Sequence, residues 1–320
     1  MMRFSEGEKG KFFIFMKKTI LILIILFFSN IAYAGYARII SLAPSITSEL
    51  YDLDSEESLI GVTSYCKAPG KEIVGTLLDI NLEKVVSLKP DLIVATSEWN
   101  NTSVIDKLKR LNLNVVVFGR QDNFNYVCND FLKLADLVDK KPQAEKLIEN
   151  IKKEVFAISL RSQSISRKKV LWQVNARPLI TIGKIALASD LLKFVGAVNL
   201  FSDINMPYSR VSYEEAVKRN PDIIILAGMD NVMQDEKDYW QKFKGVEAIK
   251  NNRIFILDPY KSCQPTPVKF LESLKIVDNL INPNHIYSSS EPLPKAEASR
   301  EGEVDVLDSA PSAPRSNRKP

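Results

Sequence analysis

Histidine and paired cysteines are almost missing from this sequence. It has one histidine, His285, and three cysteines, Cys66, Cys128 and Cys263, with no Cys-x-x-Cys pair. Because zinc and manganese sites usually recruit several imidazoles or thiolates, we expect no resident metal centre. A serine or cysteine hydrolase needs a histidine base, and His285 stands beside the C-terminal tail. Two of the cysteines can pair in an oxidising compartment, but the sequence does not select the pair.

Nucleotide motifs and strong charge are missing as well. The sequence has neither a Gly-x-Gly-x-x-Gly fingerprint nor a P-loop. Its Asp-x-Asp, at residues 52–54, ends an expected helix instead of following a strand, which argues against a metal–nucleotide site. The net charge is +4 and no basic stripe is present, so nucleic acid is not expected as a partner.

The one marked apolar run lies near the N-terminus, where residues 1–34 have the order of an export signal. Two lysines precede the apolar stretch 19–28, and residues 32–34 form a small-x-small cleavage site. The stretch is too short for a membrane span. No cysteine follows the cleavage site, so we expect export to the periplasm without a lipid anchor. Whether the chain starts at Met1 or Met16 stays open, as does the mature N-terminus.

The composition also sets the expected domain boundaries. From residue 288 onward Ser, Pro, Glu, Lys and Arg dominate, which predicts a disordered tail at 288–320 whose role the sequence leaves open. About 250 residues remain between signal and tail, enough for two packed lobes. We place an N-terminal lobe at 35–141 and a C-terminal lobe at 167–287, with residues 142–166 between them.

The most informative feature is an internal repeat. Residues 81–95 and 212–226 align without a gap, and each copy predicts an N-capped helix, a Pro-Asp stop and a buried aliphatic strand. Glu83 and Glu214 fall at equivalent positions in the first helical turns, where the helix dipole favours negative charge. We therefore infer two similar lobes, each exposing an acidic helix start at an equivalent place.

Strands alternate with helices in both lobes, which is typical of an α/β protein with doubly wound parallel sheets. Besides the repeats, the expected strands are 38–42, 59–63 and 115–118 in the first lobe and 169–173, 179–182 and 253–257 in the second. The expected helices are 44–53, with Ser45 or Thr47 as cap, then 102–111, 125–137, 188–195, 239–248 and 267–280.

Between the lobes, residues 142–166 predict one long amphipathic helix. Pro142 suits its first turn, and apolar residues recur at helical spacing from Ala144 to Ile158. At ~1.5 Å per residue such a helix spans about 35 Å, roughly the width of a domain. Because a single helix is a stiff link, we expect the lobes to move little against each other.

Several segments resemble a known family. Residues 38–45, 61–65 and the first repeat resemble periplasmic substrate-binding proteins of ABC importers, of the cobalamin and iron–siderophore class with a helical backbone. Asn-Leu-Phe at 199–201 and Pro-Tyr-Ser-Arg-Val-Ser-Tyr-Glu at 207–214 continue the match. The resemblance covers about 38–282, and within the family it is closest to the cobalamin binders.

The resemblance implies two Rossmann-like lobes with parallel sheets, joined by one long helix, with a ligand cleft between them. It implies a monomeric carrier with no catalytic residues, no cofactor of its own and no bound metal ion, whose cargo is a cobalt or iron chelate, cobalamin before others. It also implies that Glu83 and Glu214 dock onto arginines of an ABC permease in the inner membrane.

For the cleft, the resemblance and the strand ends select aromatic residues. Tyr65 and Tyr208 match positions in ligand loops of the family, and Trp99 follows strand 92–95, at the edge where α/β sheets bind ligands. A flat, partly apolar chelate gains affinity from stacking and apolar burial, while a few polar groups set its orientation.

Some positions depart from the cobalamin binders. Leu77 and Tyr208 stand where those proteins carry tryptophan, and the acidic residue of the last ligand loop is shifted or absent near Tyr260. Arg120 and Arg177 flank expected strands, and if they reach the cleft they favour carboxylates, such as those of haem or carboxylate siderophores.

Two alternatives therefore stay open. Within the same fold the cargo is an iron–siderophore or haem, and the sequence does not identify the chelate. In another class the protein is an exported α/β enzyme with its active site between the lobes. The sequence has neither a paired-cysteine motif that could hold a metal cluster nor a well-placed carboxylate motif for a metal–nucleotide complex.

Overall fold

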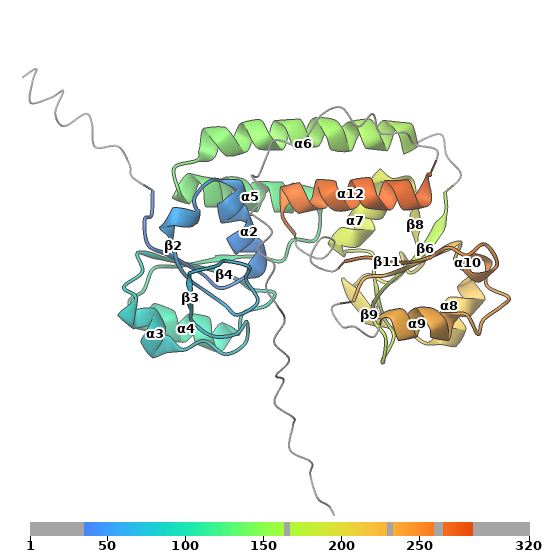
Figure 1. The fold of residues 1–320 in the computed structure, drawn as a ribbon, viewed down its shortest axis with the longest axis horizontal. Helices are drawn as coiled ribbons and strands as arrows, with labels where there is room; N and C mark the ends of the chain where they lie inside the picture. Colours follow the sequence, from blue (N-terminus) through green and yellow to red (C-terminus); the bar gives the residue numbers. More distant parts are fainter. Residues whose placement is uncertain (1–34, 163–166, 229–232, 259–264, 284–320) are drawn as a thin grey trace, which may run out of the picture. The chain divides into compact units, whose positions relative to one another are not determined.

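Figure 1 shows two α/β lobes with a layer of helices running along one side of both. This computed structural model describes residues 35–162, 167–228, 233–258 and 265–283. The expected leader and tail lie outside the described residues, as do Tyr260, Cys263 and His285.

The first lobe is built on a five-stranded parallel sheet in the order β3-β2-β1-β4-β5. The strands are β1 (Ile39–Ser41), β2 (Leu59–Val62), β3 (Glu72–Ile73), β4 (Leu92–Thr96) and β5 (Val115–Phe118). One face is covered by α3 (Leu82–Ser87) and α4 (Thr102–Arg110), the other by α2 (Pro44–Asp52) and α5 (Phe124–Leu137), with a 3-10 turn, η1 (Glu56–Ser58), before β2. Because both faces are covered, β4 is buried along its whole length, which explains its unbroken apolar sequence.

The second lobe has a six-stranded sheet in the order β11-β10-β6-β7-β9, with β8 beside β6. The strands are β6 (Lys169–Asn175), β7 (Ile180–Ile182), β8 (Val198–Asn199), β9 (Tyr208–Arg210), β10 (Ile223–Leu226) and β11 (Ile254–Ile256). Its helices are α7 (Leu187–Phe194), α8 (Tyr213–Arg219), α9 (Met233–Trp240), α10 (Glu247–Lys250) and α12 (Pro267–Ile281). Strands β10 and β11 run parallel to their neighbours, as expected, and β8, which was not expected as a strand, runs parallel to β6. Strands β7 and β9 join antiparallel, because the link from β6 to β7 is too short for a crossover.

The repeated segments fold alike in the two lobes. Asn81 accepts a hydrogen bond from the amide of Lys84 (2.9 Å) at the start of α3, and Ser212 accepts one from Glu215 (3.1 Å) at the start of α8. Both predicted caps are thus confirmed. The chain then leaves each helix through a residue in the left-handed region, Lys89 (φ 47°) and Asn220 (φ 50°) in the two copies.

The Pro-Asp element of the repeat ties each helix to the neighbouring strand. The Asp91 carboxylate accepts a hydrogen bond from the amide of Arg38 (3.0 Å), and Asp222 accepts one from Lys169 (2.7 Å). The side chain of Arg38 donates in turn to carbonyls at the end of α3, and that of Lys169 to the carbonyl of Arg219 (2.8 Å). The start of a strand and the end of a helix are therefore satisfied together, which fixes the height of each repeat helix relative to its sheet.

The predicted cap of α2 is wrong. The residue before the helix is Ala43, which has no capping side chain, and Pro44 occupies the first turn. Neither Ser45 nor Thr47 caps it, since Thr47 lies within the helix and its hydroxyl donates to Ser41 Oγ (2.8 Å) instead. Proline suits the first helical position, because its fixed φ is helical and the amide that it lacks would have no partner within the helix.

The predicted helix 239–248 is wrong as well. Helix α9 ends at Trp240 and α10 begins at Glu247, with turns at 241–246 between them. Gly245 lies in these turns, and glycine disfavours a helix interior. The turn brings Phe243 against Tyr213 and Trp240, so aromatic packing rather than helix propensity decides the path.

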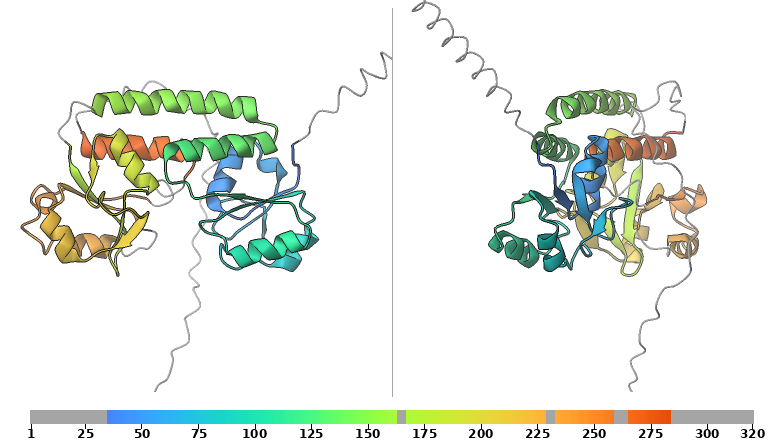
Figure 2. Two further views of the ribbon diagram at one scale, coloured as in Figure 1. Left: turned by 180° about the vertical axis from the view of Figure 1, so that it is seen from behind. Right: turned by 60° about the vertical axis from the view of Figure 1, so that its left-hand side comes forward.

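The long helix expected between the lobes is confirmed as α6, and it belongs to a layer of helices. Helix α6 (Lys141–Ser162) begins one residue before the expected start, and residues 163–166 lie outside the described residues. It packs on α5, α7 and α12, which run beside it in Figures 1 and 2. Phe124 of α5 stacks on Phe270 of α12 with ring centroids 4.5 Å apart, and Phe194 of α7 meets both rings edge-on. Helices of both lobes thus share one apolar contact.

A half-buried acid, Asp52, ends α2 and lies near α12. Asp52 Oδ2 has no hydrogen-bond partner within the described chain, and Asp52 interacts electrostatically with Lys269 and Glu272 of α12. Burial raises the pKa of Asp52 to about 7; Lys269 opposes the shift, and Glu272 and Asp54 add to it. The folded protein therefore binds the proton more tightly than the unfolded chain does.

This raised pKa predicts a pH dependence of stability. Because the folded pKa exceeds the unfolded one, the free energy of unfolding falls as pH rises from about 4 to 7. In Asp52→Asn this pH-dependent loss is absent. The free energy of unfolding of the variant, relative to that of the parent chain, should therefore rise by about 1–4 kcal/mol between pH 4 and 7. Urea unfolding at several pH values measures it, with Asp106→Asn on α4 as the exposed control. A constant difference between pH 4 and 8 would contradict the prediction.

Candidate ligand-binding site

The site lies at the carboxyl ends of strands β4 and β5, where parallel sheets usually bind ligands. Glu98 and Trp99 follow β4, and Arg120 and Asp122 follow β5. The turn after β4 is held by Asn100, whose side chain accepts from the amide of Thr96 (2.8 Å) and donates to carbonyls of Leu42 and Leu77. Glu98 and Trp99 are therefore presented on a fixed turn.

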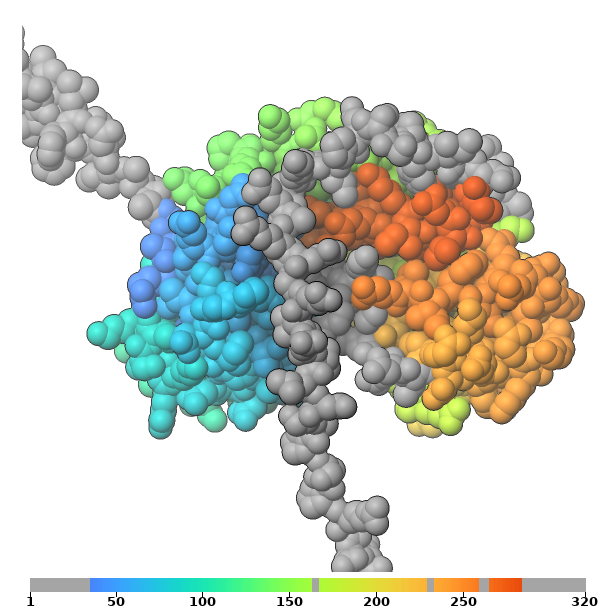
Figure 3. Space-filling model, in the orientation of Figure 1, coloured from blue at the N-terminus to red at the C-terminus, as the bar shows by residue number. Residues whose placement is uncertain are grey.

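A cavity of about 440 Å³ lies between these residues and the second lobe. Such a volume is within the range of small-molecule sites. The second lobe supplies most of the wall from β6, β7, β9 and α7, and α12 contributes Phe270 and Ser273. In the view of Figure 3, first-lobe atoms, blue to cyan, lie on the left and second-lobe atoms, mostly orange, lie on the right.

The second-lobe wall is mainly apolar. Trp172 of β6 is 1% exposed and lies at the cavity, together with aliphatic residues of β7 and α7 such as Ile182 and Leu191. Trp99 from the first lobe and Tyr208 from the second are 45% and 42% exposed. The cavity thus combines a buried indole with two accessible aromatic side chains, one from each lobe, which suits a flat and partly apolar ligand.

The first-lobe wall carries charge. Arg120 donates two hydrogen bonds to the Asp122 carboxylate, from Nε and, at 3.1 Å, from Nη2. This bond raises the pKa of Arg120, and Glu98 and Tyr208 contribute further. Burial raises the pKa of Glu98. The positive charge of Arg120 opposes this shift, and the negative charge of Asp122 adds to it. Arg120 of one lobe and Tyr208 of the other therefore lie near enough to interact electrostatically across the cavity.

Tyr208 ends a segment, residues 199–208, that is anchored at both ends. At its start, Asn199 donates to the carbonyls of Ile182 and Gly183 and to Ser189 Oγ, at 3.0–3.2 Å. Near Tyr208, the amide of Gly183 donates to the carbonyl of Pro207 (2.9 Å). A Cβ at Gly183 would lie 2.1 Å from the carbonyl oxygen of Met206, so only glycine permits this approach.

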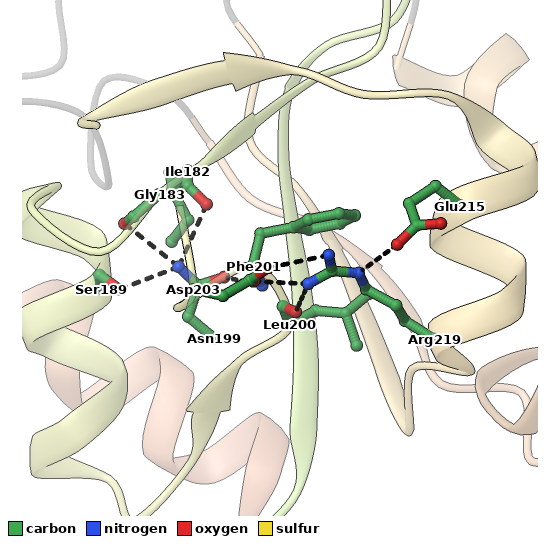
Figure 4. Close-up of polar contacts among 9 residues, drawn as sticks. All are labelled: Ile182, Gly183, Ser189, Asn199, Leu200, Phe201, Asp203, Glu215 and Arg219. Atoms are coloured by element: carbon green, nitrogen blue, oxygen red, sulfur yellow. Dashed lines mark hydrogen bonds and ion pairs between the residues drawn. The ribbon is translucent and has the colours of Figure 1, made fainter. Parts of the chain in front are cut away.

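Helix α8 is bonded through Arg219 to the middle of the segment 199–208. The guanidinium of Arg219 bonds both carboxylate oxygens of Asp203, at 2.5 and 3.0 Å, and the carbonyl of Leu200 at 3.0 Å. It also bonds Glu215 (2.8 Å) and lies over the ring of Phe201, as Figure 4 shows. The helix that carries Glu214 is therefore bonded to the segment that carries Tyr208.

The first turn of α7 faces the cavity from the second lobe. Its N-cap, Ala186, has no capping side chain, and Leu187 and Ala188 line the cavity. The free amides of a first helical turn favour electronegative groups nearby. This wall thus offers hydrogen-bond donors, opposite the carboxylates of the first lobe.

The structure brings together three of the six predicted ligand residues. Trp99, Tyr208 and Arg120 line the cavity. Tyr65 follows β2 at the same edge of the first sheet, is 54% exposed and does not line the cavity within the described residues. Arg177 is exposed, lies over the ring of Tyr239 at 5.3 Å and is likewise no part of the described lining. The sixth, Tyr260, is outside the described residues.

Sequence reasoning missed several lining residues. Glu98 and Asp122 adjoin predicted residues, and their position directly after strands was a usable signal. Trp172 was expected in the core, where it is buried, but it also borders the cavity. The wall made by α7 and α12 had no signal, because helix packing decides which face looks inward.

Glu83 and Glu214 are both exposed at the starts of α3 and α8. These helices lie on the side of the sheets away from α6, one in each lobe (Figure 1). Hydrogen bonds from its own backbone and from Ser212 lower the pKa of Glu214, which keeps it ionised. The two carboxylates are therefore solvent-accessible charges at equivalent places in the repeat.

Other kinds of site are not found within the described residues. No cluster of His, Cys, Asp and Glu side chains there is suited to a metal ion. None of the described helices is long and apolar enough to cross a bilayer. Cys66 and Cys128 are both free thiols, and burial raises the pKa of Cys128 to about 12, so this thiol is unreactive at neutral pH.

Known proteins are similar to this chain in sequence and in fold. The family model for periplasmic binding protein matches residues 39–261. The vitamin B12-binding protein of Pectobacterium carotovorum subsp. carotovorum (strain PC1) is 30% identical over 227 residues, 69% of this chain and 82% of that relative.

Two solved structures share the fold. A possible iron-binding (periplasmic solute-binding) protein from Staphylococcus epidermidis is 30% identical with a TM-score of 0.69, covering 78% of this chain and 99% of that one. The periplasmic heme-binding protein of Vibrio cholerae matches at 20% identity and a TM-score of 0.69, covering 77% and 99%. Because the family model matches more than half of the chain, the protein belongs to the periplasmic binding protein family.

Proposed function

We propose that this binding protein, which is not an enzyme, captures a metal chelate in the periplasm and delivers it to an ABC importer, with cobalamin as the preferred cargo. The observation that carries the proposal is the cavity between the lobes, with Trp99 on one side and Tyr208 on the other. Two aromatic side chains facing one apolar cavity suit the flat face of a tetrapyrrole-like ring. The vitamin B12-binding relative supports cobalamin in particular.

A haem or iron chelate is the second candidate. The iron- and heme-binding proteins of similar fold motivate it, and the first turn of α7 is compatible with it. Free amides at a helix start suit an anionic group, such as a carboxylate on the rim of a haem. Cobalamin also carries an anionic group, a phosphodiester, so this feature alone does not separate the two.

Delivery requires recognition by the membrane permease. We propose Glu83 and Glu214 as the two docking charges, because they are exposed and equivalent in the repeat, and because their helices, α3 and α8, lie on the same side of the sheets. Paired charges give register and partner choice with little apolar area. In this proposal residues 1–34 direct export and are removed, so the chain acts as a soluble carrier.

The test is a titration of the exported, purified protein with cyanocobalamin, haemin and a ferric siderophore. Quenching of tryptophan fluorescence and the visible band of each chelate report binding. We expect cyanocobalamin to bind one to one with a Kd below about 1 μM. Preference for haemin would select the second candidate, whereas binding of none of the three would contradict the proposed function.

A further inference from the structure

We propose that the first-lobe wall of the cavity selects chelates whose rim carries amides and rejects chelates whose rim carries carboxylates, with Glu98 as the specificity-determining residue. This inference rests on the proposed function. It concerns the chemical groups at the edge of the ligand, whereas the aromatic side chains address its face.

The first observation is the charge of this wall. Among the described residues that line the cavity, the charged ones are Glu98, Arg120 and Asp122, which leaves one more negative than positive charge. All of them follow β4 or β5, so they lie together at one sheet edge. A second anion brought into this corner would meet like charge in a partly desolvated space.

The second observation is that the arginine is already occupied. Two nitrogens of Arg120 bond the two oxygens of Asp122, which is the fork geometry that an incoming carboxylate would need. Arg120 was expected to attract carboxylates, but here its matching edge is satisfied within the protein. A ligand carboxylate would have to displace Asp122 or bind the remaining edge beside it.

The third observation is the state of Glu98. It is half-buried, and no hydrogen bond or ion pair joins it to any described residue, although Arg120 is near enough to affect its charge. An ionised carboxylate accepts hydrogen bonds and donates none. Primary amides on a corrinoid rim supply N–H donors to this acceptor, whereas carboxylates supply none at neutral pH.

The opposite wall limits the scope of this selection. The first turn of α7 presents free amides, so an anion placed there is favoured. The phosphodiester of cobalamin is compatible with that wall while its amides face Glu98. The selection therefore acts on groups set against the first lobe, and the pocket does not exclude every anion.

The test compares two corrinoids that share one ring. Cyanocobalamin is titrated beside the form in which peripheral propionamides are hydrolysed to carboxylates, at neutral pH. We expect the carboxylate form to bind the parent protein about 10-fold or more weakly, because like charges meet. Glu98→Gln should reduce the difference in affinity between the two corrinoids. It should change the affinity for cyanocobalamin less than about threefold, since glutamine still accepts a hydrogen bond.

Further variants secure the test. Asp122→Asn releases the fork of Arg120 and should raise affinity for the carboxylate form by about 10-fold. Glu145→Gln, at an exposed position of α6, removes the same charge outside the cavity lining. It should change neither the affinity for cyanocobalamin nor that for the carboxylate form. Thermal unfolding of each variant confirms that it is folded.

The outcomes separate the two proposals. Equal binding of both corrinoids to the parent protein, or a gap that neither Glu98→Gln nor Asp122→Asn alters, overturns the selection but leaves the carrier function standing. Haemin bound more tightly than cyanocobalamin also overturns it, because haem carries carboxylates. Binding of no chelate at all contradicts the proposed function itself.

Discussion

Replacing Glu83 and Glu214 together by alanine is expected to reduce chelate uptake by at least about 100-fold, because charge pairs at a docked interface are each worth a few kcal/mol. Ligand affinity should stay unchanged, since both side chains are exposed on helices α3 and α8 and neither lines the cavity. Uptake of labelled chelate by whole cells and equilibrium binding to the purified protein measure the two effects.

The matched control is the pair Glu145→Ala and Glu149→Ala on α6, on the other side of the sheets. It removes the same charge and should leave uptake intact. The single variants Glu83→Ala and Glu214→Ala should each show an intermediate loss, because each lobe contributes one contact. Normal uptake by the Glu83/Glu214 double variant would show that the permease docks elsewhere.

Replacing Trp99 and Tyr208 together by alanine is expected to weaken chelate binding by about 100-fold or more. Each aromatic anchor in a binding pocket contributes roughly 1–3 kcal/mol through apolar burial and ring contact. The two residues come from different lobes, so their joint loss removes one side chain from each wall of the cavity. Equilibrium titration of the chelate gives the affinities.

Two exposed tyrosines serve as comparisons for this variant. Tyr126 of α5 is 54% exposed and does not line the cavity, so Tyr126→Ala should have no effect on affinity. Tyr65 is equally exposed and also lies outside the lining, although the family resemblance assigns it to a ligand loop. A large effect of Tyr65→Ala would mean that the ligand reaches across the sheet edge from β4 to β2. An affinity unaffected by the loss of Trp99 and Tyr208 would contradict the site.

Much of the fold could be predicted because local rules and packing agree. The repeat at 81–95 and 212–226 carries its own caps, stops and buried strands, and both copies fold as expected. Strand β5 has the predicted bounds, because a short aliphatic run between turn residues is typical of a buried strand. The failures lie where tertiary packing decides, as in the aromatic cluster that turns the chain at Phe243.

The candidate site was only partly predictable. Strand ends identify Trp99 and Arg120 because the carboxyl edge of a parallel sheet is known from the order of elements. Arg120 and Asp122 are only two residues apart in the sequence, yet only the structure shows that Asp122 accepts hydrogen bonds from the guanidinium of Arg120. Strand β9 was missed, and so was the antiparallel direction of β7, although a four-residue link after β6 signals a hairpin rather than a crossover.

The central claim is that a chelated metal is held between the two lobes. Crystals of the protein with cyanocobalamin or haemin, measured at the absorption edge of cobalt or iron, locate that metal directly by its anomalous signal. The account predicts one strong peak in the cavity between the side chains of Trp99 and Tyr208, below α12. A peak on an outer surface of either lobe, in protein that binds the chelate in solution, would contradict it.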